Sequence, residues 1–385
     1  MQKSYLGVNL FGNRINQKLF FERIDFLKKE IDKFIFYLVI AGTETSQIQG
    51  ISAAGINPKA RRKTALADAE FLLFGASIDH KYKLPFLSAG VTPALISHVC
   101  SKLINASPIV VPIGIKEKPY FSHFIVENYL VGPAKCLSTG SSMNKKRVLS
   151  LYKKGLEIGK SAKTHIFISE SVPGGTTTAQ AVMEAFGLNV KTLIGSSLIN
   201  PPRNLKNKVI KAGLLKANLK NNFDSLDVIS SVGDPFQAFS MGLLIGARLA
   251  SKSVVLSGGS QMLAVILLAL EFIDFKEKQE FVDYVFIATT GWLVKDNSMS
   301  CLLDLIADKH NVNLLGLASP LNFKSSRYKE LCDYEMGYVK EGVGAGGMSI
   351  FALLKGFSID EIVSSCQIHL ERMKELGQIS LDEDY

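Results

Sequence analysis

The sequence lacks the long apolar segments that membrane proteins need. A membrane-spanning helix requires about 20 apolar residues, whereas the run Met262–Leu270 is already interrupted by Glu271. The first residues contain no apolar stretch followed by small residues, which argues against a secretory signal peptide. We therefore expect a cytoplasmic protein with no membrane partner.

Cysteine and histidine are few and scattered. The five cysteines are odd in number and never form C-x-x-C, so we expect neither a disulfide framework nor a structural zinc site. The six histidines show no H-E-x-x-H spacing, and no G-x-S-x-G turn occurs. These absences argue against zinc chemistry and hydrolytic triads, and we expect no metal or other cofactor.

The charge balance is basic. Lysine and arginine number 44 against 35 acidic residues, a net charge of +9, which suits nucleic acid, a membrane surface or phosphorylated small molecules. The densest basic stretch, Arg203–Lys220, has no interleaved aromatic residue and no nucleic-acid motif. We therefore expect most of its lysines on the solvated face of one helix, and no nucleic-acid partner.

Short apolar runs alternate with longer amphipathic segments along most of the 385 residues. The predicted strands are residues 36–40, 109–113, 165–169, 191–195, 253–257, 283–288 and 313–318. The predicted helices between them are residues 177–186, 205–220, 235–250, 261–272 and 299–309. This alternation predicts βαβ units in a doubly wound, mostly parallel sheet with helices on both faces, a Rossmann-like α/β fold.

The two ends of the chain differ from this pattern. Helices are predicted at residues 19–36, 345–355 and 359–376, and no strand follows the last two. We therefore expect a large α/β nucleotide-binding domain over residues 35–330. A small helical subdomain is expected from residues 1–34 and 331–385.

One glycine-rich turn follows the strand predicted at residues 165–169. Glu170 is followed by Pro173-Gly174-Gly175. Three consecutive threonines come next, the first two being Thr176 and Thr177, and they begin a predicted helix. Glycine lets the backbone approach a ligand, and hydroxyls and free amides at a helix N-terminus favour a phosphate. The alternative is an ordinary capped turn. We favour an anion site, because a turn alone does not need two glycines and three threonines.

Three further turns have a similar form. Ser257-Gly258-Gly259 links a strand to an apolar helix, which a tight connection would explain equally well. Thr43 and Glu44 follow the strand at 36–40, where polar residues suit a binding loop or simple exposure. Glu341 precedes Gly342 and Gly344. A carboxylate in a glycine-lined pocket between apolar walls would have a raised pKa and could accept a proton, whereas the alternative is a surface glutamate that caps the helix.

Together these segments resemble the nicotinate-nucleotide:dimethylbenzimidazole phosphoribosyltransferase family over roughly residues 35–350. The family's E-x-G-x-G-N-T-T loop is similar to Glu170–Thr177, with the glutamate, the second glycine and both threonines in register. Its E-G-T-G-A motif is similar to Glu341–Ala345. Its central stretch, which ends in GARLA and a D-G turn, resembles Val232–Gly259.

The resemblance implies an enzyme, a pentosyltransferase that moves the phosphoribosyl group of nicotinate mononucleotide to a nitrogen base. Glu341 would be the general base, and Glu170 would stabilise positive charge on the sugar. The phosphate would lie against residues 174–177 with Lys208 as its counter-charge. The products would be nicotinate and an α-ribazole-phosphate-type nucleotide for a cobamide lower ligand. The resemblance also implies a homodimer. The substrate site would be completed by Thr43, Glu44, Ser257, Gly258, Gly259, Gly342 and Gly344.

The sequence departs from the family at three places. The family's A-G-D-H-G is Ala41–Thr45 here, the aspartate of its D-G turn is Ser257, and the asparagine of its nucleotide loop is Gly175. The accepted base therefore stays open between a benzimidazole, a purine such as adenine and a phenolic compound. A non-catalytic regulatory protein that binds nicotinate mononucleotide is the alternative function. A phosphotransferase would need a lysine in the loop and acidic magnesium ligands, and neither is visible.

Overall fold

The computed structural model describes residues 4–52, 55, 57–196, 198–274 and 278–379. Within these ranges the strands form one eight-stranded sheet in the order β1-β2-β8-β7-β6-β5-β3-β4. The strands from β3 to β8 are parallel, and β1 and β2 form an antiparallel pair beside β8. Their bounds are β1 Ser4–Tyr5, β2 Val8–Phe11, β3 Phe34–Ala41, β4 Ile109–Ile113, β5 His165–Ser171, β6 Val254–Ser257, β7 Val285–Thr290 and β8 Leu315–Ser319.

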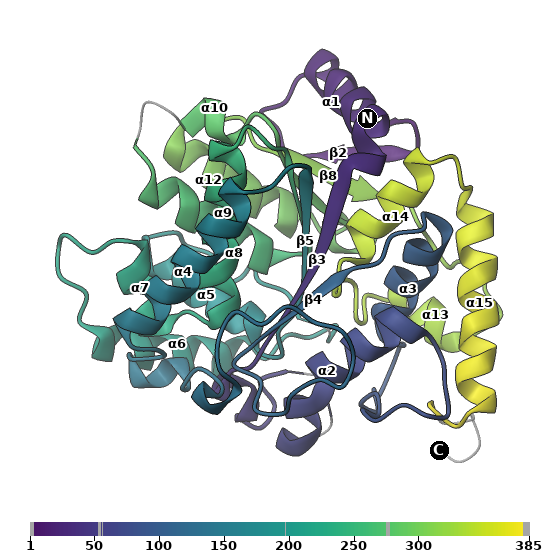
Figure 1. Ribbon diagram of the computed structural model, residues 1–385, viewed down its shortest axis with the longest axis horizontal. Helices are drawn as coiled ribbons and strands as arrows, with labels where there is room; N and C mark the ends of the chain where they lie inside the picture. The colour runs from purple at the N-terminus through teal and green to yellow at the C-terminus, as the bar shows by residue number, and fades with distance from the viewer. Residues whose placement is uncertain (1–3, 53–54, 56, 197, 275–277, 380–385) are drawn as a thin grey trace.

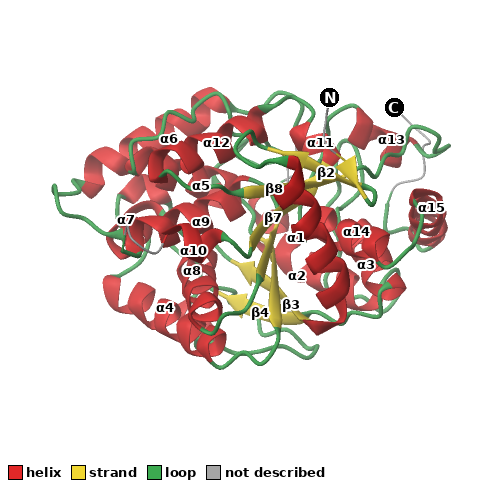
Figure 2. Ribbon diagram, turned by 90° about the horizontal axis from the view of Figure 1, so that it is seen from above, coloured by secondary structure: helices red, strands yellow, loops and turns green. Residues whose placement is uncertain are grey.

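Helices cover both faces of this sheet, so the predicted doubly wound α/β fold is confirmed (Figures 1 and 2). Successive residues of β3 point to opposite faces. Tyr37 and Val39 belong to one hydrophobic core, and Leu38 and Ile40 belong to the other. This alternation is the period of two that a strand buried on both faces requires.

The first core is covered by α4 to α10 and α12. These helices are α4 Lys145–Lys160, α5 Gly175–Ala185, α6 Arg203–Ala217, α7 Ser225–Val232, α8 Pro235–Leu249, α9 Ser260–Phe272, α10 Lys278–Val282 and α12 Ser298–His310. The second core is covered by α1 Gln17–Glu30, α2 Pro58–Phe74, α3 Ala94–Leu103, α11 Gly291–Val294, α13 Lys329–Glu335, α14 Ala345–Leu354 and α15 Ile359–Glu375. No helix within the described ranges is long and apolar enough to cross a membrane.

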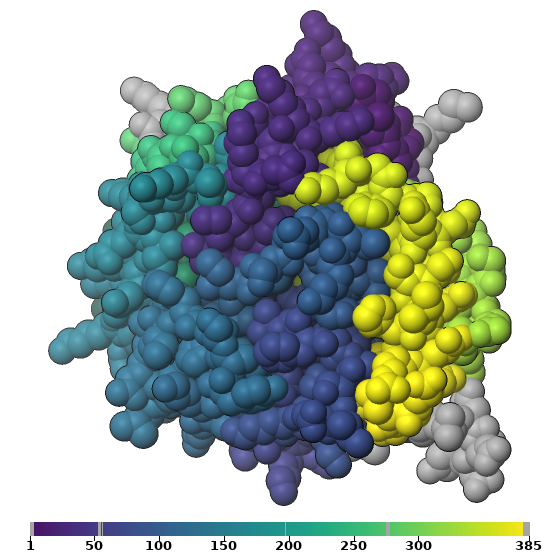
Figure 3. Space-filling view, turned by 45° about the vertical axis from the view of Figure 1, so that its right-hand side comes forward, coloured from purple at the N-terminus to yellow at the C-terminus, as the bar shows by residue number. Residues whose placement is uncertain are grey.

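The N-terminal and C-terminal segments lie on the same side of the sheet. Figure 3 shows the N-terminal residues against the C-terminal helices at the surface, and α1 contacts α14. The N-terminal segment also supplies β2, which pairs with β8 at the sheet edge and was not predicted. The division into a large domain and a small helical subdomain stays a prediction. Residues 1–3 and 380–385 of that subdomain lie outside the described residues.

Six of the seven predicted strands are present, and the strand predicted at residues 191–195 is wrong. This segment forms a turn in which the Leu193 amide donates to the Val190 carbonyl. Its apolar residues, Val190 and Ile194, are buried in the first core without entering the sheet. The short apolar run in this segment is apolar because it is buried, and it does not pair as a strand. The helix predicted at residues 19–36 gives way to a 3₁₀ turn at Ile31–Lys33 and then to β3.

The strand order reverses between β3 and β5. From β3 the chain first forms β4 on one side, and β5 then pairs with β3 on the other side. Ligands of open α/β sheets bind outside the carboxyl ends of the strands at such a reversal. This rule directs attention to the end of β5 and to the loops beside it.

Candidate active site

Glu170 is the next-to-last residue of β5 and is only 5 % exposed. Its Oε2 accepts hydrogen bonds from the Val172 amide at 2.9 Å and from Gln261 Nε2 at 2.7 Å. Burial raises the pKa of Glu170 to about 8, the two donors partly offset this rise, and the nearby Glu341 carboxylate adds to it. The site therefore holds a buried carboxyl group that can change its protonation near neutral pH.

The glycine-rich turn after β5 makes room for the Gln261 contact. Gly174 adopts the left-handed conformation (φ 81°) and is the N-cap of α5. A Cβ on Gly175 would lie 2.3 Å from Gln261 Nε2, a distance that no real Cβ tolerates. A side chain at position 175 would therefore have to displace the end of Gln261, the amide group that donates to Glu170.

Glu341 lies in the loop before α14 and is held by four donors. Its Oε2 accepts from Thr289 Oγ1 at 3.1 Å and from the Thr290 amide at 2.8 Å. Its Oε1 accepts from the amides of Gly342 and Gly346 at 3.0 and 3.3 Å. Burial raises the pKa of Glu341 to about 7, although these donors stabilise the charged form. A carboxylate with a pKa near 7 suits general base catalysis at neutral pH.

The loop that carries Glu341 is strained. Val339, Lys340 and Val343 all adopt left-handed conformations, with φ values of 60°, 57° and 55°. Such conformations are rare for β-branched residues and cost of the order of 1–3 kcal/mol each. The Val343 amide donates to the Glu170 carbonyl at 2.9 Å, and Ser97 Oγ donates to the Val343 carbonyl at 3.0 Å. The fold therefore enforces a costly backbone path, in which Val343 ties the loop to β5 while the Glu341 carboxyl group is held at the end of β7.

Two neighbouring cavities share the walls formed by both glutamates. The first, which we call the Lys340 cavity, has a volume of about 70 Å³ and extends toward α12. The second, which we call the Asp68 cavity, has a volume of about 130 Å³ and extends toward α2. Residues common to both are Glu170, Thr176, Ser196, Gln261, Val339 and Glu341. The two carboxyl groups thus stand where a ligand in one cavity would meet a ligand in the other.

Two lysines approach the Lys340 cavity from different elements. Lys206 on α6 is buried, and its Nζ donates to Thr176 Oγ1 at 2.9 Å and to the Gly195 carbonyl at 3.0 Å. Burial lowers the pKa of Lys206 to about 8, and the positive charges of Arg203 and Lys340 lower it further. The ammonium group of Lys340 forms no hydrogen bond or ion pair within the described ranges, and its Nζ lies 3.8 Å from where a Cβ on Gly195 would stand. Two converging ammonium groups without a bonded carboxylate favour an anionic ligand.

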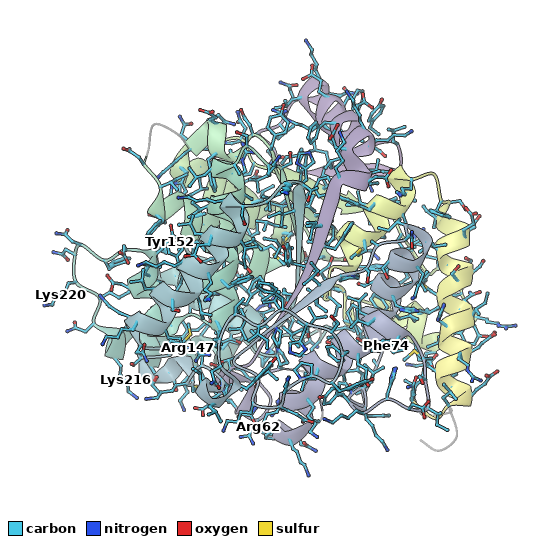
Figure 4. The ribbon with its side chains drawn as sticks, in the orientation of Figure 1. Arg62, Phe74, Arg147, Tyr152, Lys216 and Lys220 are labelled. Carbon is cyan, nitrogen blue, oxygen red and sulfur yellow. The ribbon has the colours of Figure 1, made fainter. Side chains whose placement is uncertain are left out.

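The lysine expected at this loop was Lys208, and the structure corrects that choice. Lys208 is exposed on α6, whereas Lys206 reaches Thr176. Side chains at positions i and i+2 of a helix point about 200° apart around its axis. Only one of these two lysines can therefore face the loop. Lys206 was also expected on the solvated face. Lys216 and Lys220 do lie exposed, at the outer edge of the molecule (Figure 4).

The other predicted site residues fall into three groups. Gly174, Gly175, Thr176, Gly259 and Gly342 line one or both cavities. Thr177, Ser257, Gly258 and Gly344 line neither. Ser257 instead links β6 to α14, because its Oγ donates to the Gly344 carbonyl at 3.1 Å and accepts from the Gly347 amide at 2.9 Å.

Thr43 and Glu44 lie elsewhere. They line a separate cavity of about 220 Å³ at the ends of β3 and β4, which also contains Arg61 and Lys116. Pro173 borders both this cavity and the Asp68 cavity. The expected grouping of Thr43 and Glu44 with the glutamate site therefore does not appear in the cavity lining.

Sequence reasoning missed four residues that the fold brings to the site. Gln261 follows the predicted Ser-Gly-Gly turn, and its position at the start of a helix could have suggested a role. Asp68 stands with Glu70 among the alanine, leucine and phenylalanine residues of α2, where buried acids are unusual. Lys206 and Lys340 gave no signal, because neither differs locally from the many other lysines.

Two similarities to known protein sequences bear on this chain. The model of a family described as phosphoribosyltransferase matches residues 92–288. A UPF0284 protein of Prochlorococcus marinus subsp. pastoris (strain CCMP1986 / NIES-2087 / MED4) is 84% identical over 384 residues, covering 100% of both chains. The similarity to that relative thus extends along the whole length of both chains.

Two solved structures share the fold. The crystal structure of CobT from Thermus thermophilus superposes with a TM-score of 0.57 at 16% identity, covering 90% of this chain and 88% of the other. The nicotinate-nucleotide-dimethylbenzimidazole phosphoribosyltransferase structure from the same organism gives a TM-score of 0.55 at 14% identity, covering 92% and 96%. At these identities the likeness concerns the arrangement of helices and strands.

Proposed function

Since the chain belongs to the nicotinate-nucleotide:dimethylbenzimidazole phosphoribosyltransferase family, we propose that it transfers the phosphoribosyl group of nicotinate mononucleotide to a nitrogen base. The products are nicotinate and an α-ribazole-phosphate-type nucleotide, a precursor of the lower ligand of a cobamide. The observation that carries this proposal is a pair of carboxyl groups, the buried Glu170 and the partly buried Glu341, in the shared wall of two adjoining cavities.

The nucleotide phosphate binds in the Lys340 cavity. Lys206 uses two of its three N–H donors on Thr176 and Gly195, which leaves one for a ligand oxygen. Lys340 supplies a second ammonium group, and Thr176 and Gly195 line the same cavity. Phosphate binding relieves the repulsion between the two lysines and offsets the desolvation of both.

The transfer exchanges one bond at the anomeric carbon for another. A ring nitrogen of the base attacks this carbon, while the bond to the nicotinate nitrogen breaks and its electron pair neutralises the pyridinium ring. Glu341 accepts the proton from the second ring nitrogen of the base, and the raised pKa makes the carboxylate basic enough for this step. The strained loop and four donors fix its direction before the base arrives.

Glu170 stabilises the sugar in the transition state. The departure of nicotinate gives the ribose positive character, which a nearby carboxylate stabilises most strongly in a site that excludes water. Glu170 is held by Gln261 and by the Val172 amide. Its charge develops more readily once a cationic group enters the cavity, because opposite charge lowers the pKa that burial has raised.

The test is nicotinate release from nicotinate mononucleotide, followed by chromatography, with each candidate base supplied in turn. Base-dependent release is the expected result for the wild-type protein. Glu341→Gln is expected to lower turnover about 10²–10⁴-fold with little change in donor binding. The exposed Glu157→Gln is the matched control and should behave as wild type. Donor binding without release for any base would instead indicate a non-catalytic nucleotide-binding regulatory protein.

We also propose that the protein acts as a homodimer. Several large apolar side chains near the end of α2 and in the loop after β4 are exposed, namely Phe74, Ile78, Tyr120, Phe124, Ile125, Leu130 and Val131. A group of exposed apolar residues is typical of a protein interface. Sedimentation equilibrium tests this, and Leu130→Asp, at a side chain that is 93% exposed, should favour the monomer.

A further inference from the structure

Asp68 places a carboxyl group in the wall of the Asp68 cavity. A purely apolar base bound there would form no hydrogen bond with it. The residue is on α2, only 6 % of it is exposed, and it lines the cavity together with Glu170 and Glu341. Thr92 Oγ1 donates to its Oδ1 and Ser171 Oγ donates to its Oδ2, both at 2.8 Å. Within the described ranges, no lysine, arginine or histidine forms an ion pair with it.

This arrangement leaves hydrogen-bonding capacity toward the cavity. A carboxylate offers about four acceptor sites on its two oxygens, and two of them are filled by the hydroxyls. Because both hydroxyls donate to Asp68, they fix the carboxylate in place and do not neutralise it. Burial raises the pKa of Asp68 to about 6, so the group is ionised at neutral pH. A buried carboxylate with spare acceptor sites binds an N–H donor in preference to a methyl group.

The remaining walls suit a flat ring. Ile51, Pro85, Leu87, Pro93 and Val343 contribute apolar surface, and the volume of about 130 Å³ is small. The cavity thus combines an apolar slot with one carboxylate from α2 and another, Glu341, from the loop before α14. A ring that presents one nitrogen to Glu341 needs a second polar group to satisfy Asp68.

We infer that the accepted base is an amino-substituted nitrogen heterocycle of the aminopurine class, and that Asp68 accepts a hydrogen bond from its exocyclic amino group. This inference rests on the proposed transfer reaction and names its acceptor. Asp68 is then a specificity-determining residue, because a ring without the amino group leaves the buried carboxylate without its ligand partner.

The test compares adenine with purine, which is the same ring without the amino group, and with 5,6-dimethylbenzimidazole. In wild-type protein, kcat/KM for adenine should exceed that for purine by about 10- to 100-fold, the range expected for a hydrogen bond to a charged group. Asp68→Ala should reduce this ratio to near one. Thr92→Val, which disturbs the same network but keeps the carboxylate, should retain most of the preference, and the exposed Asp79→Asn should retain all of it.

The outcomes separate this inference from the proposed function. Equal rates with adenine and purine, or a preference for dimethylbenzimidazole in the wild-type protein, overturn the inference and leave the transfer reaction intact. Release with no base removes the proposed function, and calorimetric binding of adenine against purine then decides whether Asp68 recognises the amino group. A loss of the ratio in Thr92→Val as large as in Asp68→Ala would show a structural effect and overturn the role of the carboxylate. If Asp68→Ala does not fold, the wild-type ratio alone decides.

Discussion

Gln261 Nε2 donates a 2.7 Å hydrogen bond to Glu170 Oε2, and the backbone of Gly175 lies directly against the same amide nitrogen. Two segments that are far apart in the sequence, the end of β5 with its following turn and the start of α9, therefore meet at one carboxyl oxygen. A side chain at position 175 would disturb this approach, and the first residues of α9 act on the chemistry through Glu170.

The first prediction concerns this contact. Gln261→Leu leaves Glu170 Oε2 with only the Val172 amide, so its charged form becomes harder to create in the transition state. We expect turnover to fall about 10- to 100-fold, since a hydrogen bond to a charged group contributes about 1.5–3 kcal/mol. Gly175→Ala should act similarly, because the added Cβ must displace the amide. Nicotinate release at saturating donor measures both.

The exposed Gln279→Leu on α10 serves as the control for the loss of an amide side chain. Circular dichroism and thermal unfolding establish that each variant is folded. Wild-type turnover in a folded Gly175→Ala protein would show that the position of Gln261 has no bearing on catalysis.

The second prediction separates two lysines on one helix. Lys206→Met removes an ammonium group that contacts Thr176, and we expect the KM for nicotinate mononucleotide to rise about 10- to 100-fold with a smaller effect on kcat. Lys208→Met changes the same residue type at an exposed position and should leave KM unchanged. Steady-state kinetics over donor concentration decide between them. The opposite pattern would restore Lys208 as the phosphate contact.

These lysines also show where the sequence was informative and where it was not. Glu170 and Glu341 could be predicted because each precedes a glycine-rich turn at the end of a strand or before a helix, a local pattern. The choice between Lys206 and Lys208 depends on the rotation of α6 against the loop, which no local pattern fixes. Asp68 is placed by α2, a helix that was not predicted, so its approach to the site required the tertiary structure.

The fold, like the site, could be predicted where a local sequence pattern determines it and could not where a tertiary contact does. The alternation of strands and helices predicted the parallel sheet and both helical layers, because burial on two faces imposes apolar strands. Apolar periodicity could not separate a strand from a buried turn at Val190–Ile194, since both are equally apolar. The pairing of β2 with β8 joins the N-terminal segment to a strand far along the chain, and short strands leave little trace in a sequence.

The third prediction is the pH dependence of turnover. Glu341 accepts a proton only when it is ionised, and burial raises its pKa to about 7. Turnover should therefore rise about tenfold per pH unit below that value and level off above it. The test is to measure turnover at saturating donor and base between about pH 5.5 and 9. This range roughly covers the titration of a carboxyl group whose pKa is raised to about 7. A profile that is flat from about pH 5 upward would assign the proton to another acceptor.

The fourth prediction concerns stability. The pKa of Glu170 is raised to about 8 in the folded protein, so folding favours its protonated form. That contribution is fully present below its ordinary pKa of 4.5 and is lost as the pH rises through about 8. Glu170→Gln stays neutral and should therefore gain stability relative to wild type as the pH rises, by roughly a few kcal/mol at about pH 9 and little at about pH 5. Urea unfolding at both pH values measures the difference, with the exposed Glu157→Gln as control. If the stability gained by Glu170→Gln over wild type instead shrinks as the pH rises, the folded protein stabilises the charged form of Glu170.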